Sequence, residues 1–384
     1  MPPTSRAGGL PSTQAAPAPI TMTRWEALFV APWGSWATAL PVRLGFFILA
    51  AALSLFLSYK AVHNQITETQ ILTEDRVSLA AYLDGSAFRP FAYRFLTPVL
   101  VNFAEHTLDV PALLKHAPLI LQTKAAGLCT RATAQPQASC DDVASYAAVA
   151  WASCLAFLLV MYGNVQLLFR NPLISFLGVG FTYLVVNAIL LARLSHVYDF
   201  SVLLIVSALM YCLLRRWTLA FMLLLPFAYA TKETLGLWAG VFFVAQVGRM
   251  PLARNAALFA AQLVAFVVVH GAIRAHFAGN AGFGHEYYLP LQISFFTEHI
   301  DLAMLLAMLF ALVLVFHDFA RKHEVLRRAS VVIPPWFVLF MIGGVEREVR
   351  VMLEILPLVI LLAMDGLVRF IRVPTSGATP AMSR

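Results

Sequence analysis

The sequence predicts an all-α, polytopic membrane protein with about ten transmembrane helices. Of its 384 residues, 60% are hydrophobic and only 12% are charged, whereas soluble domains carry about 25% charged residues. The mean hydropathy of +0.77 agrees. So few polar side chains cannot cover a large water-soluble globule, which excludes a cytosolic enzyme, a secreted domain and a disordered chain. The apolar residues form continuous runs and do not alternate, which favours helical spans over a β-barrel.

Ten apolar segments are predicted to be these helices. They are residues 43–60, 145–169, 173–195, 200–214, 217–231, 234–248, 255–273, 302–317, 331–344 and 351–368. The fourth, fifth, sixth and ninth are short for a hydrocarbon core of about 30 Å.

The two ends of the chain differ from this transmembrane domain, which we expect to cover residues 43–372. Residues 1–23 are rich in Pro, Ala, Ser and Thr, and this composition predicts a disordered tail. Residues 24–42 contain three tryptophans and few charges, as an interfacial helix does. The first apolar run comes too late for a cleaved signal peptide. Residues 373–384 are predicted to be a second tail.

The distribution of positive charge predicts the orientation. The net charge is +7, but the Lys and Arg residues form short clusters between apolar runs, as orientation signals do. This pattern argues against a nucleic-acid partner. Basic clusters on alternate connections place both termini in the cytoplasm of a bacterial inner membrane. The long connections 61–144 and 274–301 are then outer loops.

The first outer loop has features of a folded segment. Residues 92–110 and 111–123 are semi-apolar with prolines near their starts, and we expect interfacial helices there. Cys129 and Cys140 lie in the same loop, on the predicted oxidising side, where a disulfide can form. The alternative is two free thiols.

Candidate chemistry begins just beyond the first span. Glu74 and Asp75 are adjacent carboxylates that can act as a general base or ligate a divalent cation. Arg89, Tyr93 and Arg94 follow, and arginine holds phosphate bidentately. The alternative is a solvated loop with surface ion pairs.

Two tight outer turns carry further polar residues. His196 and Asp199 lie between two spans, where Asp199 could instead cap the following helix. Lys232 and Glu233 form a second turn, and charges so near to membrane depth are costly unless they are partnered. Lys232 could face an anionic lipid headgroup, or the pair could form a self-paired hinge.

A fourth charged segment precedes the last span. It contains Glu346, Arg347 and Arg350, and a helix would pair Glu346 with Arg350. The arginines could bind phosphate if they face the bundle interior. The alternative is an ion-paired helix start.

Several motifs are absent from the sequence. There is no phosphate-binding Walker loop, no dinucleotide glycine fingerprint, no GxSxG and no HExxH. ATP hydrolysis and zinc proteolysis are therefore not expected. The two halves show no clear internal repeat, which argues against a classical secondary transporter.

The order of these features, over roughly residues 43–368, resembles the GT-C superfamily of polytopic glycosyltransferases. The resemblance is to the bacterial membrane proteins at the edge of that superfamily. The features that carry the resemblance come in sequence: the acidic pair Glu74–Asp75, the stretches Arg89–Pro90 and Tyr93–Arg94, the turns His196–Asp199 and Lys232–Thr234, and the charged segment Glu346–Arg350. The resemblance implies transfer of a sugar from a polyprenyl-phosphate-linked donor on the outer face of the membrane.

This resemblance also implies roles for the residues. Asp75, with Glu74 as its partner or substitute, would be the general base, and the other candidates would bind substrate. The membrane lipid and the lipid-linked sugar are the expected partners. The carboxylate pair leaves a divalent cation open as a cofactor. The alternatives are a lipid or solute transporter or flippase, and a non-catalytic envelope assembly subunit.

Overall fold

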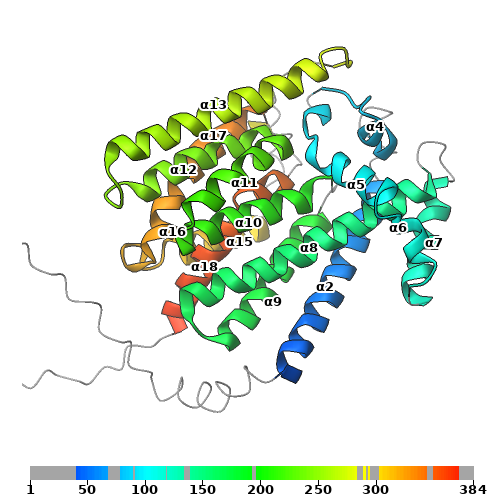
Figure 1. The fold of residues 1–384 in the computed structure, drawn as a ribbon. Coiled ribbons are helices and arrows are strands. Elements are labelled where there is room, and N and C mark those ends of the chain that lie inside the picture. The colour runs from blue at the N-terminus through cyan, green and yellow to red at the C-terminus, as the bar shows by residue number, and fades with distance from the viewer. Residues whose placement is uncertain are drawn as a thin grey trace, which may run out of the picture.

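The computed structural model describes residues 40–67, 78–89, 91–117, 119–133, 139–192, 196–282, 289–290, 293–294, 302–343 and 349–371. These residues are almost entirely helical, and within them no strand forms beyond two isolated bridges (Figure 1). The predicted tails, 1–23 and 373–384, and most of the expected interfacial helix at 24–42 lie outside the described residues.

Each of the ten predicted apolar segments is helical. The helices are α2 (Leu40–Thr67), α8 (Cys140–Phe169), α9 (Pro172–Ala192), α10 (Asp199–Arg215), α11 (Thr218–Thr231), α12 (Leu237–Gln246), α13 (Leu252–His276), α15 (Leu302–Phe316), α17 (Ile333–Gly343) and α18 (Leu356–Ile371). The count of ten spans is not confirmed, because within the described ranges five segments are long and apolar enough to cross a membrane: 44–65, 140–169, 172–190, 252–276 and 324–342.

Chain geometry explains the shorter helices. A straight span needs about 20 residues, whereas α10 has 17, α11 has 14 and α12 has 10. Arg216 adopts a left-handed conformation (φ 60°) and ends α10, and Lys232 turns to extended backbone at the end of α11.

Helix α8 is the centre of the packing. It begins at a capping box, in which Ser139 Oγ accepts from the backbone N–H of Asp142 and the Asp142 carboxylate accepts from the N–H of Ser139. Along its length α8 packs against α2, α9 and α10. Phe157 and Met161 are fully buried in these contacts.

The surface of α13 inverts the pattern of a soluble helix. Its Asn255 and Gln262 are buried, whereas Val264, Val267 and Val268 are 63%, 66% and 62% exposed. The Asn255 amide donates to the carbonyl of Phe243 at 2.8 Å. A polar inner side and an apolar outer side suit a helix that faces lipid.

The helices of residues 61–144, the segment predicted to be the first outer loop and called the outer loop below, gather at one end of the bundle, on the right-hand side of Figure 1. They are α4 (Leu79–Asp84), α5 (Leu96–His106), α6 (Val110–Leu114) and α7 (Leu119–Thr133). The helix expected at 92–110 begins later, at Leu96, after a 3-10 turn over Phe91–Tyr93. The helix expected at 111–123 is divided into α6 and α7, and α7 continues to Thr133.

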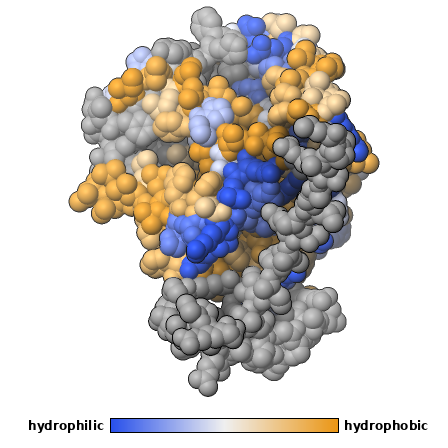
Figure 2. Space-filling view, turned by 90° about the vertical axis from the view of Figure 1, so that its left-hand side faces the viewer, coloured by the Kyte–Doolittle hydropathy of each residue, from blue (hydrophilic) through white to orange (hydrophobic). Residues whose placement is uncertain are grey.

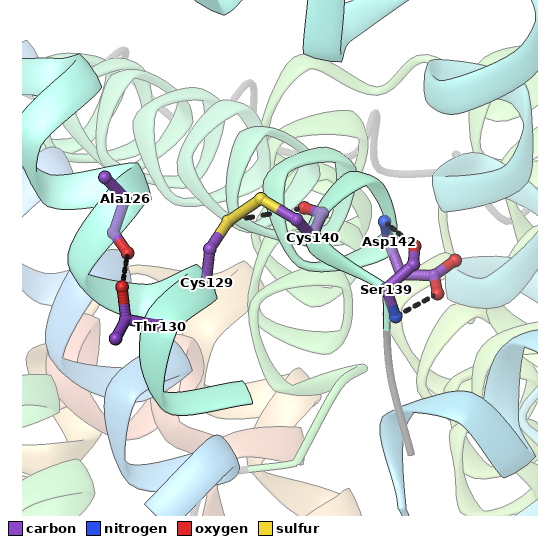
Figure 3. The surroundings of a disulfide bond; sticks show 6 residues. All are labelled: Ala126, Cys129, Thr130, Ser139, Cys140 and Asp142. Carbon is purple, nitrogen blue, oxygen red and sulfur yellow. Dashed lines mark hydrogen bonds between the residues drawn. A yellow bond between two sulfur atoms is a disulfide. The ribbon is translucent and has the colours of Figure 1, made fainter. Parts of the chain in front are cut away.

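A disulfide joins Cys129 on α7 to Cys140 at the start of α8 (Figure 3). The two Cα atoms lie 4.9 Å apart. The bridge fastens the outer-loop helices to the central helix. Cys154 and Cys212 are free and buried within α8 and α10.

The opposite end of the bundle carries ion pairs between arginines and carboxylates. Glu324, the first residue of α16 (Glu324–Ala329), pairs with Arg249 at 2.6 Å and with Arg328 at 2.5 Å. Arg369 pairs with Asp365 at 3.1 Å. Figure 2 looks onto this side of the molecule, where hydrophilic residues form a continuous patch between apolar surfaces.

Candidate functional site

Two cationic side chains converge on one tyrosine near the outer-loop helices. Arg94 donates a hydrogen bond to the hydroxyl of Tyr198, and its guanidinium carbon lies 4.5 Å from the centre of the Tyr198 ring. The Lys232 ammonium lies 5.8 Å from the centre of the same ring. All three residues are buried, with exposures of 8%, 1% and 6% for Arg94, Tyr198 and Lys232. We call this group the Tyr198 cluster.

The cluster is assembled from three distant segments. Arg94 follows the 3-10 turn before α5, Tyr198 immediately precedes α10, and Lys232 follows α11. A hydrogen bond of 2.9 Å between the hydroxyls of Thr97 and Ser201 fastens α5 to α10 beside them. The outer loop therefore contributes directly to the interior of the bundle.

A fourth segment supplies a carboxylate. Glu354 ends the 3-10 helix Val349–Glu354 and forms an ion pair with Lys232. Its Oε2 atom also accepts a hydrogen bond of 3.2 Å from the indole of Trp336. Both partners of the ion pair are buried. The attraction between the two charges therefore has to offset the hydration that each of them loses. Buried charged residues in a membrane protein are candidates for a functional site.

Glu233 is a second buried carboxylate beside this pair. Its Oε2 atom is buried and has no hydrogen-bond partner within the described part of the chain. Burial by itself would raise the pKa of Glu233, but the charges of Arg94 and Lys232 outweigh burial and hold the pKa below its usual value. The carboxylate is therefore ionised at neutral pH and keeps an acceptor position available.

His196 and Asp199 form the turn that holds Tyr198. The backbone N–H of His196 donates to Asp199 Oδ2 at 2.7 Å, which closes the turn before α10. The His196 ring stacks on the Tyr198 ring, with centres 5.5 Å apart and planes at 16°. Both residues adjoin the Tyr198 cluster. Asp199 is the first residue of α10 and does not cap it, because the helix start at Tyr198 has no side-chain cap hydrogen bond.

Arg89 lies outside the Tyr198 cluster and joins the connection 61–144 to the connection 274–301. Its backbone N–H donates to the carbonyl of Ala281 at 2.9 Å, and its guanidinium donates to the carbonyl of Gly282 at 2.8 Å. Gly282 has φ 96°, and a Cβ atom there would lie 2.8 Å from the Arg89 carbonyl oxygen. Only glycine fits this contact.

Tyr93, the residue before Arg94, packs against α13. Its ring meets the His270 ring edge to face, with centres 6.0 Å apart. The guanidinium of Arg274 lies 5.7 Å from the centre of the Tyr93 ring. His270 in turn stacks on Phe266. Tyr93 therefore packs α13 against the segment that carries Arg94.

The remaining candidates are not placed. Glu74, Asp75, Glu346 and Arg347 lie outside the described residues, and Arg350 is described only by its backbone in the 3-10 helix that ends at Glu354. Within the described ranges, no group of three or more His, Cys, Asp or Glu side chains could hold a metal ion.

Two members of the site were not among the sequence candidates. Tyr198 stood inside the polar turn between His196 and Asp199, but a buried tyrosine has no distinctive pattern in sequence. Glu354 did carry a signal, because an acidic residue inside an apolar run is expensive and calls for a partner. The identity of that partner, Lys232, depends on the fold.

No protein-family model, curated protein or solved structure matches this chain. The chemistry of the site therefore rests on its geometry. Arg94, and Lys232 where it exchanges Glu354 for another anion, can bind an anion beside the ionised carboxylate of Glu233, which can accept a proton.

Proposed function

We propose that this protein is an integral membrane glycosyltransferase that uses a polyprenyl-phosphate-linked sugar donor on the outer face of a bacterial inner membrane. The observation that carries the proposal is the juxtaposition of Arg94 and Lys232 with the buried carboxylate of Glu233, whose Oε2 atom has no hydrogen-bond partner among the described residues. The resemblance to the GT-C superfamily supports the same substrate class.

The position of the cluster supports a lipid-linked donor. The hydrocarbon part of such a donor stays in the bilayer, so its phosphate and sugar are met at the membrane boundary. The Tyr198 cluster lies where α10 begins and α11 ends, beside the short helix α5. A boundary location suits an enzyme better than a transporter, which needs polar groups along a path through the membrane.

The proposed reaction needs a base and cations. The acceptor hydroxyl attacks the anomeric carbon of the sugar, the bond from that carbon to the phosphate oxygen breaks, and the hydroxyl proton passes to a carboxylate. Arg94 has the planar fork that binds phosphate bidentately. Lys232 can stabilise the departing charge if it exchanges Glu354 for phosphate.

Two carboxylate positions compete for the role of base. Asp75, with Glu74 beside it, is the choice from the sequence. Glu233 is the choice from the described geometry, because its Oε2 atom is buried and has no hydrogen-bond partner within the described part of the chain. Loss of a true base should lower the rate by about 10²–10⁴.

Reconstitution tests the proposal. The full chain in proteoliposomes is given a panel of short-chain polyprenyl-phosphate hexoses, and the release of polyprenyl phosphate is measured. We expect turnover of at least one donor by the native protein and its loss in the Arg94→Gln variant. The matched control is Arg89→Gln, which removes an arginine of the same loop that contacts Gly282 instead.

Two outcomes would contradict the proposal. One is the absence of turnover with every donor while the folded protein moves a labelled lipid between leaflets, which favours the flippase alternative. The other is full complementation of a deletion strain by variants that neutralise Arg94, Glu233 and Asp75 together, which favours an assembly subunit.

A further inference from the structure

A second feature lies on the other side of α8 from the Tyr198 cluster. An open cavity of about 420 Å³ lies between α2, α6, α7 and α8. Ala144 and Ala147 of α8 line it, whereas their neighbour Tyr146 interacts electrostatically with Asp199 on the other side. The helix therefore separates the cavity from the cluster. The volume lies within the range of about 300–1,000 Å³ that is typical of ligand sites.

The interior of the cavity suits a hydrocarbon chain. Its lining is almost wholly apolar and includes Leu55 of α2, Leu114 of α6 and Leu128 of α7. Two polar groups of the lining have partners on α2. Ser58 donates to the Leu55 carbonyl at 3.2 Å, and the Trp151 indole donates to the Ala51 carbonyl at 3.4 Å.

One positively charged side chain, Lys124, lines this cavity. Lys124 on α7 is the charged residue of the lining, and its ammonium lies 4.7 Å from the centre of the Tyr59 ring. Its side chain is exposed, so it marks the mouth of the cavity. Within the described ranges no carboxylate forms an ion pair with it. The charge is complementary to an anion bound at the mouth.

The cavity lies where apolar surface and solvent meet. Two of its walls, α2 and α8, are long and apolar enough to cross a membrane. The short helices that form the other walls carry exposed leucines. Leu119 is 77% exposed, and Leu113, which also lines the cavity, is 61% exposed. Exposed leucines on short helices beside a span are typical of a segment that lies on the bilayer surface. An occupant with an apolar chain and an anionic head fits both regions.

The disulfide holds two of these walls together (Figure 3). Cys129 follows the lining residue Leu128 on α7, and Cys140 precedes the lining residue Val143 on α8. We propose that this cavity binds a hydrocarbon chain of an anionic lipid, with Lys124 against the headgroup phosphate. This site is independent of the proposed transferase activity.

The tryptophan in the lining makes the proposal testable. The full chain is placed in nanodiscs of phosphatidylcholine that contain a small fraction of brominated phosphatidylglycerol or of brominated phosphatidylcholine. The contribution of Trp151 to the fluorescence is isolated by subtracting the signal of the Trp151→Phe variant. We expect the anionic lipid to quench Trp151 at about fivefold lower concentration, since one lysine near a membrane surface contributes that preference.

Three variants separate the contributions. Lys124→Gln should abolish the preference for the anionic lipid, and the matched control Lys115→Gln, on a residue outside the lining, should keep it. Ala148→Phe fills the cavity and should reduce quenching by both lipids. The double variant Cys129→Ser, Cys140→Ser should weaken quenching by both, because α7 is no longer fastened to α8.

Equal quenching by the two lipids in the native protein would overturn the proposal, as would a preference that survives Lys124→Gln. Soluble glycerol phosphate distinguishes a lipid site from a phosphate site, because it should not relieve the quenching. Relief by glycerol phosphate alone would also overturn the proposal. If Ala148→Phe fails to fold, the comparison of Lys124→Gln with Lys115→Gln still decides the outcome.

Discussion

Lys232 and Glu354 form a buried ion pair that joins the end of α11 to the segment before α18. Each residue is expensive to bury alone, and together they connect the second half of the bundle to the cluster around Tyr198. This pair is therefore the point at which folding and the proposed chemistry are most closely linked.

The first prediction concerns the stability of this pair. Glu354→Gln leaves the Lys232 ammonium buried beside a neutral amide, and we expect a loss of about 3–5 kcal/mol in the free energy of unfolding. The variant that replaces both residues, Lys232→Met with Glu354→Leu, should recover most of that loss because neither partner of the pair is left without the other. Thermal unfolding in detergent measures both. Equal stability of the native protein and Glu354→Gln would show that the pair is not buried as described.

The second prediction concerns Arg94. Arg94→Lys keeps the charge but loses the planar fork that lies over the Phe91 and Tyr198 rings. We expect a substantial fall in donor turnover with little change in the amount of folded protein. Arg89→Lys should leave turnover near the native level, since the Arg89 guanidinium contacts a backbone carbonyl. Equal effects of the two changes would argue against a role for Arg94 in substrate binding.

The third prediction concerns the acidic pair before α4. Asp75→Asn keeps the shape of the side chain and removes its charge, so a general base at this position should lose about 10²–10⁴ in rate. Expression and folding should not change. Complementation of the deletion strain's envelope phenotype is the practical measurement. Full complementation by the double variant Asp75→Asn, Glu74→Gln would transfer the role of base to another residue, with Glu233 the first to test.

The fourth prediction follows from the lowered pKa of Glu233, which lies beneath its ordinary value of 4.5 because Arg94 and Lys232 outweigh the effect of burial. The folded state holds the proton less tightly than the unfolded state. The ionised carboxylate therefore contributes stability above pH 4.5, and this contribution disappears as the pH falls through the folded-state pKa.

The unfolding temperature of the native protein and of Glu233→Gln, measured from pH 7 downwards, should reveal this contribution. We expect the difference between the two proteins to be largest near neutral pH and to shrink below pH 4.5. A difference that grows as the pH falls would have the wrong sign for a carboxylate stabilised by neighbouring cations.

The fifth prediction is the orientation. Arg327 lies exposed on α16, at the end of the bundle where Glu324 pairs with Arg249 and Arg328. The positive-inside pattern assigns that end to the cytoplasm. In a background in which Cys154 and Cys212 are replaced, Arg327→Cys should not react with an impermeant thiol reagent on intact cells, and should react after permeabilisation. Labelling of intact cells would reverse the topology and would place the Tyr198 cluster on the inner side.

The sequence predicted the positions of the ten helices because long apolar runs define them. It did not predict how many of them are long enough to span, because that depends on where a residue such as Arg216 or Lys232 interrupts the helix. The disulfide between Cys129 and Cys140 could be expected because both residues share one loop, and the structure contains it.

The candidate site shows the same limit. Local patterns identified the turns that hold His196, Asp199 and Lys232, because polar residues at membrane boundaries stand out. They could not show that Arg94 meets Tyr198 or that Arg89 is diverted to Gly282, since those contacts join segments far apart in the chain. Residue type predicted where polarity would occur, and tertiary packing decided which polar groups meet.

The attachment of Arg89 to Gly282 has a consequence for how the outer loops tolerate change. Asn280 adds two hydrogen bonds from its amide, to the carbonyls of Gly85 at 2.7 Å and Ala87 at 2.8 Å. Surface loops usually accept inserted residues, but one residue added between Gly85 and Arg89 would change their spacing, so the bonds at these two residues could no longer all form together. Arg94 lies only a short 3-10 turn further on. The length of this short segment therefore determines where the Arg94 guanidinium lies inside the bundle.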